Sequence, residues 1–133
     1  MENTFKVDGG VVGNFTPKCV MADLAGAATG DHSIGLKVPA GKIITAAFIK
    51  NLADDLTSSG SATIRLKVGS DAIGSAIGKA SLKGTAVYVP ITTESGGDTS
   101  PSAIVTTEET EVKVTVGTAA ITTGKLLVGV LYI

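Results

Sequence analysis

One short segment of the sequence brings together the residue types of a serine hydrolase. Asp31, His32 and Ser33 are consecutive, and His32 is the chain's only histidine. A hydrolase needs these three side chains in a hydrogen-bonded relay, whereas neighbouring residues of an extended chain point to opposite sides. We therefore expect the three residues to form a polar surface turn and not a catalytic site.

The sequence contains few of the residues that bind metal ions. The chain has one cysteine, Cys19, and one histidine, whereas a zinc site takes about four nitrogen or sulfur ligands. The single cysteine also excludes an internal disulfide. Four aspartates could form a calcium site or a glycosidase pair, but their spacing matches no calcium loop, and we expect solvated loop carboxylates. These residues are Asp54, Asp55, Asp71 and Asp98.

A second acidic group, Glu108, Glu109 and Glu111, also predicts a solvated turn, because loop carboxylates are normally solvated.

Residues 74–81, GSAIGKAS, differ from a phosphate-binding loop, because three residues instead of four separate the glycines and Ala80 follows the lysine. Residues 9–13, GGVVG, lack the β–α–β context of a dinucleotide site. The sequence therefore predicts no enzyme, no catalytic residue, no metal and no cofactor.

Composition bounds the class of protein. A length of 133 residues suits one domain, and a chain that is 44% hydrophobic but only 4% aromatic builds its core from small residues, which favours self-association. The 11 basic and 12 acidic residues form no basic patch, so no nucleic-acid partner is expected. No signal peptide and no apolar run of ~18 residues is present, so no membrane partner is expected either.

Alternation of apolar and polar residues predicts strands with one buried and one solvated face. It is clearest at residues 34–38, 62–68 and 112–116. In all, about seven or eight short strands are separated by clusters of Gly, Ser, Thr and Pro, as in all-β sandwiches. We predict a single antiparallel β-sandwich, jelly-roll-like, over residues 31–133. Residues 1–30, with scattered glycines and a proline, predict an extended N-terminal arm or anchoring segment.

Two segments carry apolar residues on both faces. LKVPAGKIITAAFIKN, residues 36–51, predicts strand, turn and strand, either a core hairpin or a corner between sheets; Pro39 and Gly41 suit the turn. The expected faces of its second strand are Ile44, Ala46 and Phe48 on one side and Ile43, Ala47 and Ile49 on the other. KLLVGVLYI, residues 125–133, predicts a central strand. We expect the second strand of residues 36–51 to be buried on both sides. Apolar residues on both faces of a strand agree equally well with self-association. Residues 92–102, TTESGGDTSPS, predict a polar loop.

Residues 33–70, SIGLKVPAGKIITAAFIKNLADDLTSSGSATIRLKVGS, resemble small virion structural proteins of tailed bacteriophages, of the head-decoration or auxiliary-capsid type. There, a phrase like VPAGKII precedes an apolar strand, and GSATI leads into the next strand. Residues 111–133, ending TVGTAAITTGKLLVGVLYI, resemble the last strands of the same group. The resemblance covers around half of the chain and consists of strands and turns, without a catalytic signature.

The resemblance implies a non-catalytic virion protein, made in the host cytoplasm, that decorates and stabilises the outer surface of the capsid. Its implied partners are the lattice of the major capsid protein and further copies of itself in a homotrimer. The alternative is a fibre or tail-tip module that binds host-surface carbohydrate. The polar segments at residues 53–61 and 92–102 contain no aromatic residue on which a sugar could stack.

Overall fold

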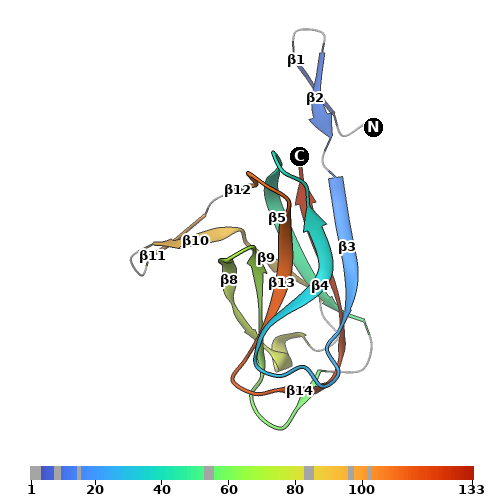
Figure 1. Cartoon of the computed structure of the whole chain (residues 1–133), viewed down its shortest axis with the longest axis vertical. Helices are drawn as coiled ribbons and strands as arrows, with labels where there is room; N and C mark the ends of the chain where they lie inside the picture. Colours follow the sequence, from blue (N-terminus) through green and yellow to red (C-terminus); the bar gives the residue numbers. More distant parts are fainter. Residues whose placement is uncertain are drawn as a thin grey trace.

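The computed structural model of the chain contains two packed antiparallel β-sheets (Figure 1). It describes residues 4–7, 10–14, 16–52, 56–82, 86–95, 98–101 and 103–133. Every strand pairing among these residues is antiparallel. The predicted all-β class and antiparallel sandwich are confirmed.

The first sheet has β15 and β5 at its centre. β3 pairs with β15, β15 pairs with β5, and β5 pairs on its other side with both β9 and β12. The bounds of these strands are β3 Thr16–Asp23, β5 Ile43–Asn51, β9 Ala86–Val89, β12 Ile104–Val105 and β15 Lys125–Tyr132. The predicted central position of residues 125–133 is confirmed.

The second sheet has the order β4-β13-β7-β8. Its strands are β4 Gly30–Val38, β7 Thr63–Val68, β8 Asp71–Gly78 and β13 Thr110–Gly117. If the two-residue β12 is left out, consecutive strands of the sandwich lie in opposite sheets, with the exception of β7 and β8. The two sandwich strands that come last in the sequence, β13 and β15, each occupy an interior position of their sheet. This winding is that of a jelly roll, so the strands of each sheet come from distant parts of the sequence.

Short elements surround the sandwich. β1 (Thr4–Val7) pairs with β2 (Gly10–Asn14), and β10 (Thr92–Ser95) pairs with β11 (Asp98–Pro101). β6 (Thr57–Ser58) pairs with β14 (Ile121–Thr123), and a single 3-10 turn covers Lys79–Leu82. The polar loop predicted over residues 92–102 is therefore wrong for most of its length, because β10 and β11 pair through backbone groups that hydrophobic patterning does not report.

The N-terminal segment joins the sandwich earlier than expected. Within residues 1–30, β3 pairs with β15 from Thr16 to Asp23 and is a full member of the first sheet. In the described part of the chain, β1 and β2 pair only with each other. The division into an anchoring segment, residues 1–30, and a sandwich domain, residues 31–133, stays a prediction.

The core lies between the two sheets and is built from aliphatic side chains that alternate along each strand. Leu36, Ile49, Ile64, Val114 and Leu126 are among those with no or negligible exposure. Aromatic rings contribute little to it: Tyr132 is the buried aromatic residue of the described core. The inner faces are poor in aromatic residues, as the composition indicated, and consist mainly of leucine, isoleucine and valine.

The turn at residues 39–42 is a corner between the sheets, because β4 and β5 lie in different sheets. Gly41 has a φ of 75°, a left-handed conformation that suits glycine. Thr106, 3% exposed, holds this corner. Its hydroxyl donates to the carbonyl of Pro39 at 2.7 Å and accepts from the amide of Lys42 at 2.9 Å. Its backbone carbonyl also accepts from the Gly41 amide at 2.7 Å.

The predicted burial of β5 on both faces is wrong within the single chain. Ala46 lies opposite Leu131, but Ile44 lies opposite Tyr132, so Thr45 is an extra residue at a bulge. The bulge places Ile44 on the core side together with Ala47 and Ile49, and not with Ala46 and Phe48 as the strict alternation predicted. Phe48 is 37% exposed and Ile43 is 39% exposed, both on the outer side of the sheet.

Thr106→Val should destabilise the fold by about 1–3 kcal/mol, because it preserves the side-chain shape but leaves the Pro39 carbonyl and the Lys42 amide without their partner. Thr106→Ser keeps the hydroxyl and should recover most of this loss. Urea denaturation at one fixed protein concentration measures both variants. Equal losses in the two variants would contradict the role given to the hydroxyl.

Candidate interaction surfaces

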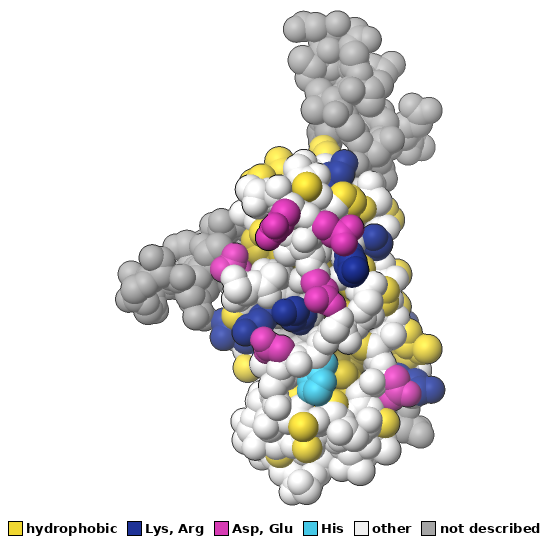
Figure 2. Space-filling model, in the orientation of Figure 1, with side chains coloured by type: hydrophobic (Ala, Val, Ile, Leu, Met, Phe, Trp, Pro, Cys, Tyr) yellow, Lys and Arg dark blue, Asp and Glu magenta, His cyan; other side chains and the backbone are white. Residues whose placement is uncertain are grey.

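The outer surface of the β4-β13-β7-β8 sheet is charged and hydrogen-bonded. Figure 2 shows acidic and basic side chains gathered on the face of the molecule that carries β4 and β13 in Figure 1. Asp31 is at its centre: its Oδ2 lies 2.9 Å from Nζ of Lys67, and its Oδ1 accepts from the Thr115 hydroxyl at 2.6 Å. Three strands are thereby linked across the surface, since Asp31 is on β4, Thr115 on β13 and Lys67 on β7.

Asp31, His32 and Ser33 engage three separate partners. His32 Nε2 donates to the carbonyl of Ala28 at 2.6 Å, whereas the Ser33 hydroxyl donates to the Glu111 carboxylate. Asp31 bonds to the neighbouring strands as described. The structure thus does not bring the three side chains into one relay, in keeping with their alternation along β4.

The hydrogen bonds to Asp31 change its titration. The Thr115 hydroxyl first, and then the Lys67 ammonium, hold the pKa of the Asp31 carboxyl below its usual range by bonding its charged form, and the nearby Lys113 acts in the same direction. Because the carboxyl is at the surface, solvent screens these interactions. The Asp31–Lys67 pair and the Asp31–Thr115 hydrogen bond orient these side chains across the three strands.

The remaining acids do not converge on a common point. Glu109 lies 3.7 Å from Lys37, Glu111 accepts from Ser33, and Glu108 is exposed at the edge of a pocket. In the described residues, no group of three or more potential metal ligands is found. Asp54 and Asp55 lie outside the described residues, as does the side chain of Asp98.

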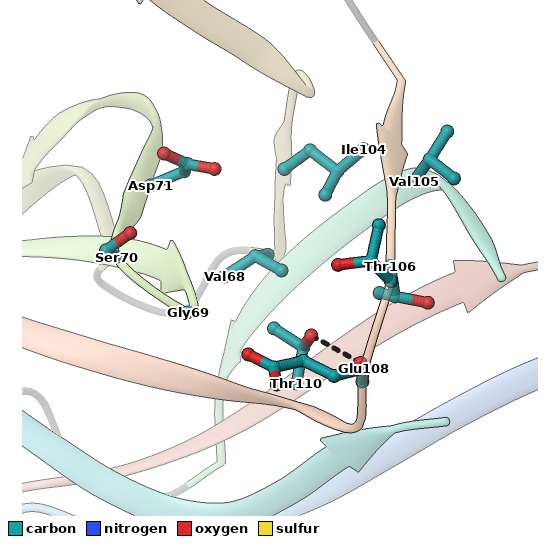
Figure 3. Close-up of a pocket in the computed structure, with 10 residues that line it drawn as sticks. Val68, Gly69, Ser70, Asp71, Ile104, Val105, Thr106, Glu108 and Thr110 are labelled. Carbon is teal, nitrogen blue, oxygen red and sulfur yellow. Dashed lines mark hydrogen bonds between the residues drawn. The ribbon is translucent and has the colours of Figure 1, made fainter. Parts of the chain in front are cut away.

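A pocket of about 250 Å³ lies where the β7–β8 turn meets the segment that joins β12 to β13 (Figure 3). Asp71 stands on one side of it and Glu108 on the other, while Ile104 and Thr106 form part of the wall. The Thr110 hydroxyl donates to the Glu108 carbonyl at 2.8 Å. Among the residues that line it there is no histidine, cysteine or lysine, so this pocket offers hydroxyls and carboxylates for contact and no nucleophile–base pair.

The outer surface of the β3-β15-β5-β9 sheet is mainly apolar, in contrast to the charged outer surface of the other sheet. Register brings outward residues of the four strands into rows: Cys19, Gly129, Phe48 and Tyr88 in one, and Met21, Leu127, Lys50 and Ala86 in the next. Pro17, Leu131 and Ala46 form a third row. We call this surface the apolar face. Lys50 within it, and Asp23 and Lys125 at one end, are its charged residues.

An aromatic ring covers the middle of the apolar face. A Cβ atom on Gly129 would lie 2.3 Å from the ring of Phe48, so the ring occupies the space above this glycine. An aromatic side chain laid across a glycine of the neighbouring strand restores the packing that the missing side chain would supply. Tyr88, directly opposite Phe48 on β9, is 62% exposed and extends the aromatic surface.

Sequence reasoning did not identify this face as a surface. The apolar character of both sides of β5 and β15 was the available signal, and it was interpreted as burial on both sides. Of the two glycine-containing segments, residues 71–78 form β8, which the 3-10 turn Lys79–Leu82 follows. Residues 10–14 form β2, whereas Gly9 lies outside the described residues. No helix in the described part of the chain has the length and apolarity to cross a membrane.

Comparison with known proteins gives matches of structure only. No protein-family model and no curated protein sequence matches the chain. A chain from the acid-stable capsid structure of Helicobacter pylori bacteriophage KHP30 superimposes with a TM-score of 0.55 at 13% identity, over 89% of this chain and 86% of its own. A chain from the capsid of Ralstonia phage GP4 gives 0.58 at 20% identity, over 91% and 84%. The protein shares its fold with chains of two phage capsids.

The extent of these matches matters more than their identity. Each covers most of both chains, so the matched chains are similar in length to this one, and the shared unit includes nearly the whole molecule. At 13% and 20% identity, the likeness establishes the fold. This fold is an antiparallel β-sandwich, the fold that the alternation at residues 34–38, 62–68 and 112–116 predicted.

Asp31→Asn should lower stability near neutral pH and have less effect in acid. A folded-state pKa below the ordinary value of about 3.9 stabilises the protein above that value, and the contribution is lost as the pH falls through the folded pKa. The difference in denaturation midpoint between wild type and variant should therefore narrow below pH ~4. Asp71→Asn, at the exposed start of β8, is the matched control. A difference that stays constant into strong acid would rule out this linkage.

Proposed function

We propose that this protein is a non-catalytic structural component of a phage virion that binds the outer surface of the capsid and stabilises it. The observation that carries the proposal is the fold likeness, over 89% and 91% of the chain, to chains of two phage capsids. The resemblance of residues 33–70 and 111–133 to head-decoration and auxiliary capsid proteins supports the same assignment. The partner would be the lattice of the major capsid protein.

The chemistry of the surface agrees with a binding role. The polar residues that could take part in catalysis are bonded to one another across strands, with Asp31 linked to Lys67 and Thr115, and Ser33 linked to Glu111. Such cross-strand pairs stiffen and stabilise a sheet. They leave a rigid body with two unlike outer faces, which suits a protein that connects other proteins.

Binding to an assembled lattice explains how such a protein would stabilise a capsid. A ligand that binds the assembled state and not the dissociated one shifts the equilibrium by mass action, by about 2.7 kcal/mol per site at a free concentration 100 times Kd. No catalysis and no change in the capsid protein itself is needed. Many sites on one particle would add their contributions.

The segment before β3 is our candidate for the capsid contact. β1 and β2 form a two-stranded ribbon that pairs with no other described strand. An isolated ribbon of this kind is at best marginally stable in water. A partner surface would supply the missing contacts, so we assign this segment to the lattice.

The alternative function, a fibre or tail-tip module that binds host-surface carbohydrate, rests on exposed aromatic rings. In the described residues, the exposed aromatic side chains are Phe48 and Tyr88. Both lie on the apolar face, and sugar sites combine stacking with hydrogen-bonding groups that this face lacks at its centre. We therefore favour the capsid over the tail.

Co-sedimentation of the purified protein with tail-less capsids that lack it tests the proposal. We expect saturable binding and a higher temperature of capsid disruption in the presence of the protein. Binding confined to tailed particles would refute capsid decoration and support the alternative.

Deletion of residues 1–15 should abolish capsid binding while leaving the sandwich folded, because β3 begins at Thr16 and keeps its pairing with β15. Circular dichroism and thermal denaturation establish that the truncated protein is folded. Deletion of residues 1–20 is the comparison variant, since it removes half of β3 and should also destabilise the sheet. Undiminished binding by the shorter truncation would place the contact on the sandwich body.

A further inference from the structure

Exposed large hydrophobic side chains are confined to one sheet. In the described part of the chain, the six that stand out are Met21 at 60%, Ile43 at 39%, Phe48 at 37%, Leu52 at 41%, Tyr88 at 62% and Val105 at 63%. Five of them lie on β3, β5, β9 and β12, and Leu52 follows β5 directly, its amide bonded to the carbonyl of Lys125 on β15. The charged sheet on the other side contributes none.

We propose that the apolar face is the contact surface between copies of this chain. This inference goes beyond the proposed function and is independent of it, since it concerns the free protein before any capsid is met. The partner is a second copy that covers the rows around Phe48 with its own apolar face.

The size of the face fits a contact between copies. Strands lie about 4.8 Å apart and rise about 3.4 Å per residue. Three strands of about eight residues and the four-residue β9 therefore cover roughly 450 Å². Two such faces in contact would bury roughly 900 Å², close to the ~1,000 Å² that a specific protein interface should reach. Ile43 and Val105, paired at the end of β5, would extend it further.

The scarcity of charged residues on the apolar face indicates the kind of partner that covers it. A surface that meets a different protein after folding is usually no more apolar than the rest of the protein, whereas interfaces between identical subunits are more apolar. Within the rows of the apolar face, Lys50 is the charged residue, and its long side chain allows the ammonium group to reach the rim. The opposite sheet, with Asp31, Lys67 and Glu111, has the polar character of a surface that stays in water.

The time at which the apolar face is first exposed also favours a second copy as its partner. An exposed apolar patch of this size is at the upper end of what monomers carry and often marks an interaction site. Another copy is the partner available as soon as the chain has folded. A capsid would cover the face only later.

The test uses the native Cys19, the chain's only cysteine, which is exposed and lies on the apolar face beside Gly129. Light scattering of the purified protein at micromolar concentration should give about twice the 13.3 kDa chain mass, because a contact in which both copies use the same face closes as a dimer. In the assembly, a maleimide should modify Cys19 slowly. In Tyr88→Glu the mass should fall toward 13.3 kDa, and labelling should be about tenfold faster or more, because protection scales with the fraction of closed subunits.

Met21→Glu is a second variant on a different strand and should act in the same way. Both side chains are more than half exposed, so neither variant removes core packing. Ala120→Glu, an equivalent change at an exposed position away from both sheets, should keep the wild-type mass and labelling rate. A wild-type protein that is monomeric, or an assembly in which Cys19 reacts as fast as in Tyr88→Glu, would overturn the proposal. Protection of Cys19 that arises only on capsids would assign the face to the capsid.

Discussion

A β-sheet has two faces, and a sandwich of two sheets covers only one face of each. In this protein the central strands β5 and β15 carry apolar residues on both sides, so closure of the sandwich leaves half of their hydrophobic surface without cover. Removing that surface from water is favourable in proportion to its area. The rest of the molecule is organised around this unbalanced sheet.

The opposite sheet is built for solvent. Its outward residues form charged and hydroxyl pairs across β4, β13 and β7, and the corner at residues 39–42, held by Thr106, places β4 and β5 on different sides of the core. The jelly-roll winding therefore separates a charged face from an apolar one within a small chain. The proposed role, in which the protein contacts both its own copies and a capsid lattice, would use such unlike surfaces.

The sequence allowed the strands to be predicted because their alternation is local. It did not allow the bulge at Thr45 to be predicted, since an extra residue in one strand shows only against its partner. The bulge exchanges the expected faces of Ile43 and Ile44 relative to the rest of β5. β10 and β11 were missed because backbone pairing of polar residues has no hydrophobic signature. The polar loop expected there was wrong.

The apolar face depends on register between distant strands. Cys19, Phe48, Tyr88 and Gly129 become neighbours only once β3, β5, β9 and β15 are aligned. Periodicity indicated that both faces of two strands are apolar, but it could not identify which neighbour covers each face. Burial of both sides within one chain was the expectation, whereas the structure leaves the outer side of this sheet exposed.

Cryo-electron microscopy of the intact virion tests the central claim most directly, because it locates the protein and orients its sheets at once. The account predicts density for the sandwich on the outer capsid surface, in clusters in which the β3-β15-β5-β9 sheets of neighbouring copies face each other and the charged sheets face solvent. Sandwich density on the tail with a bare capsid, or capsid-bound copies that turn the apolar face to water, would contradict it.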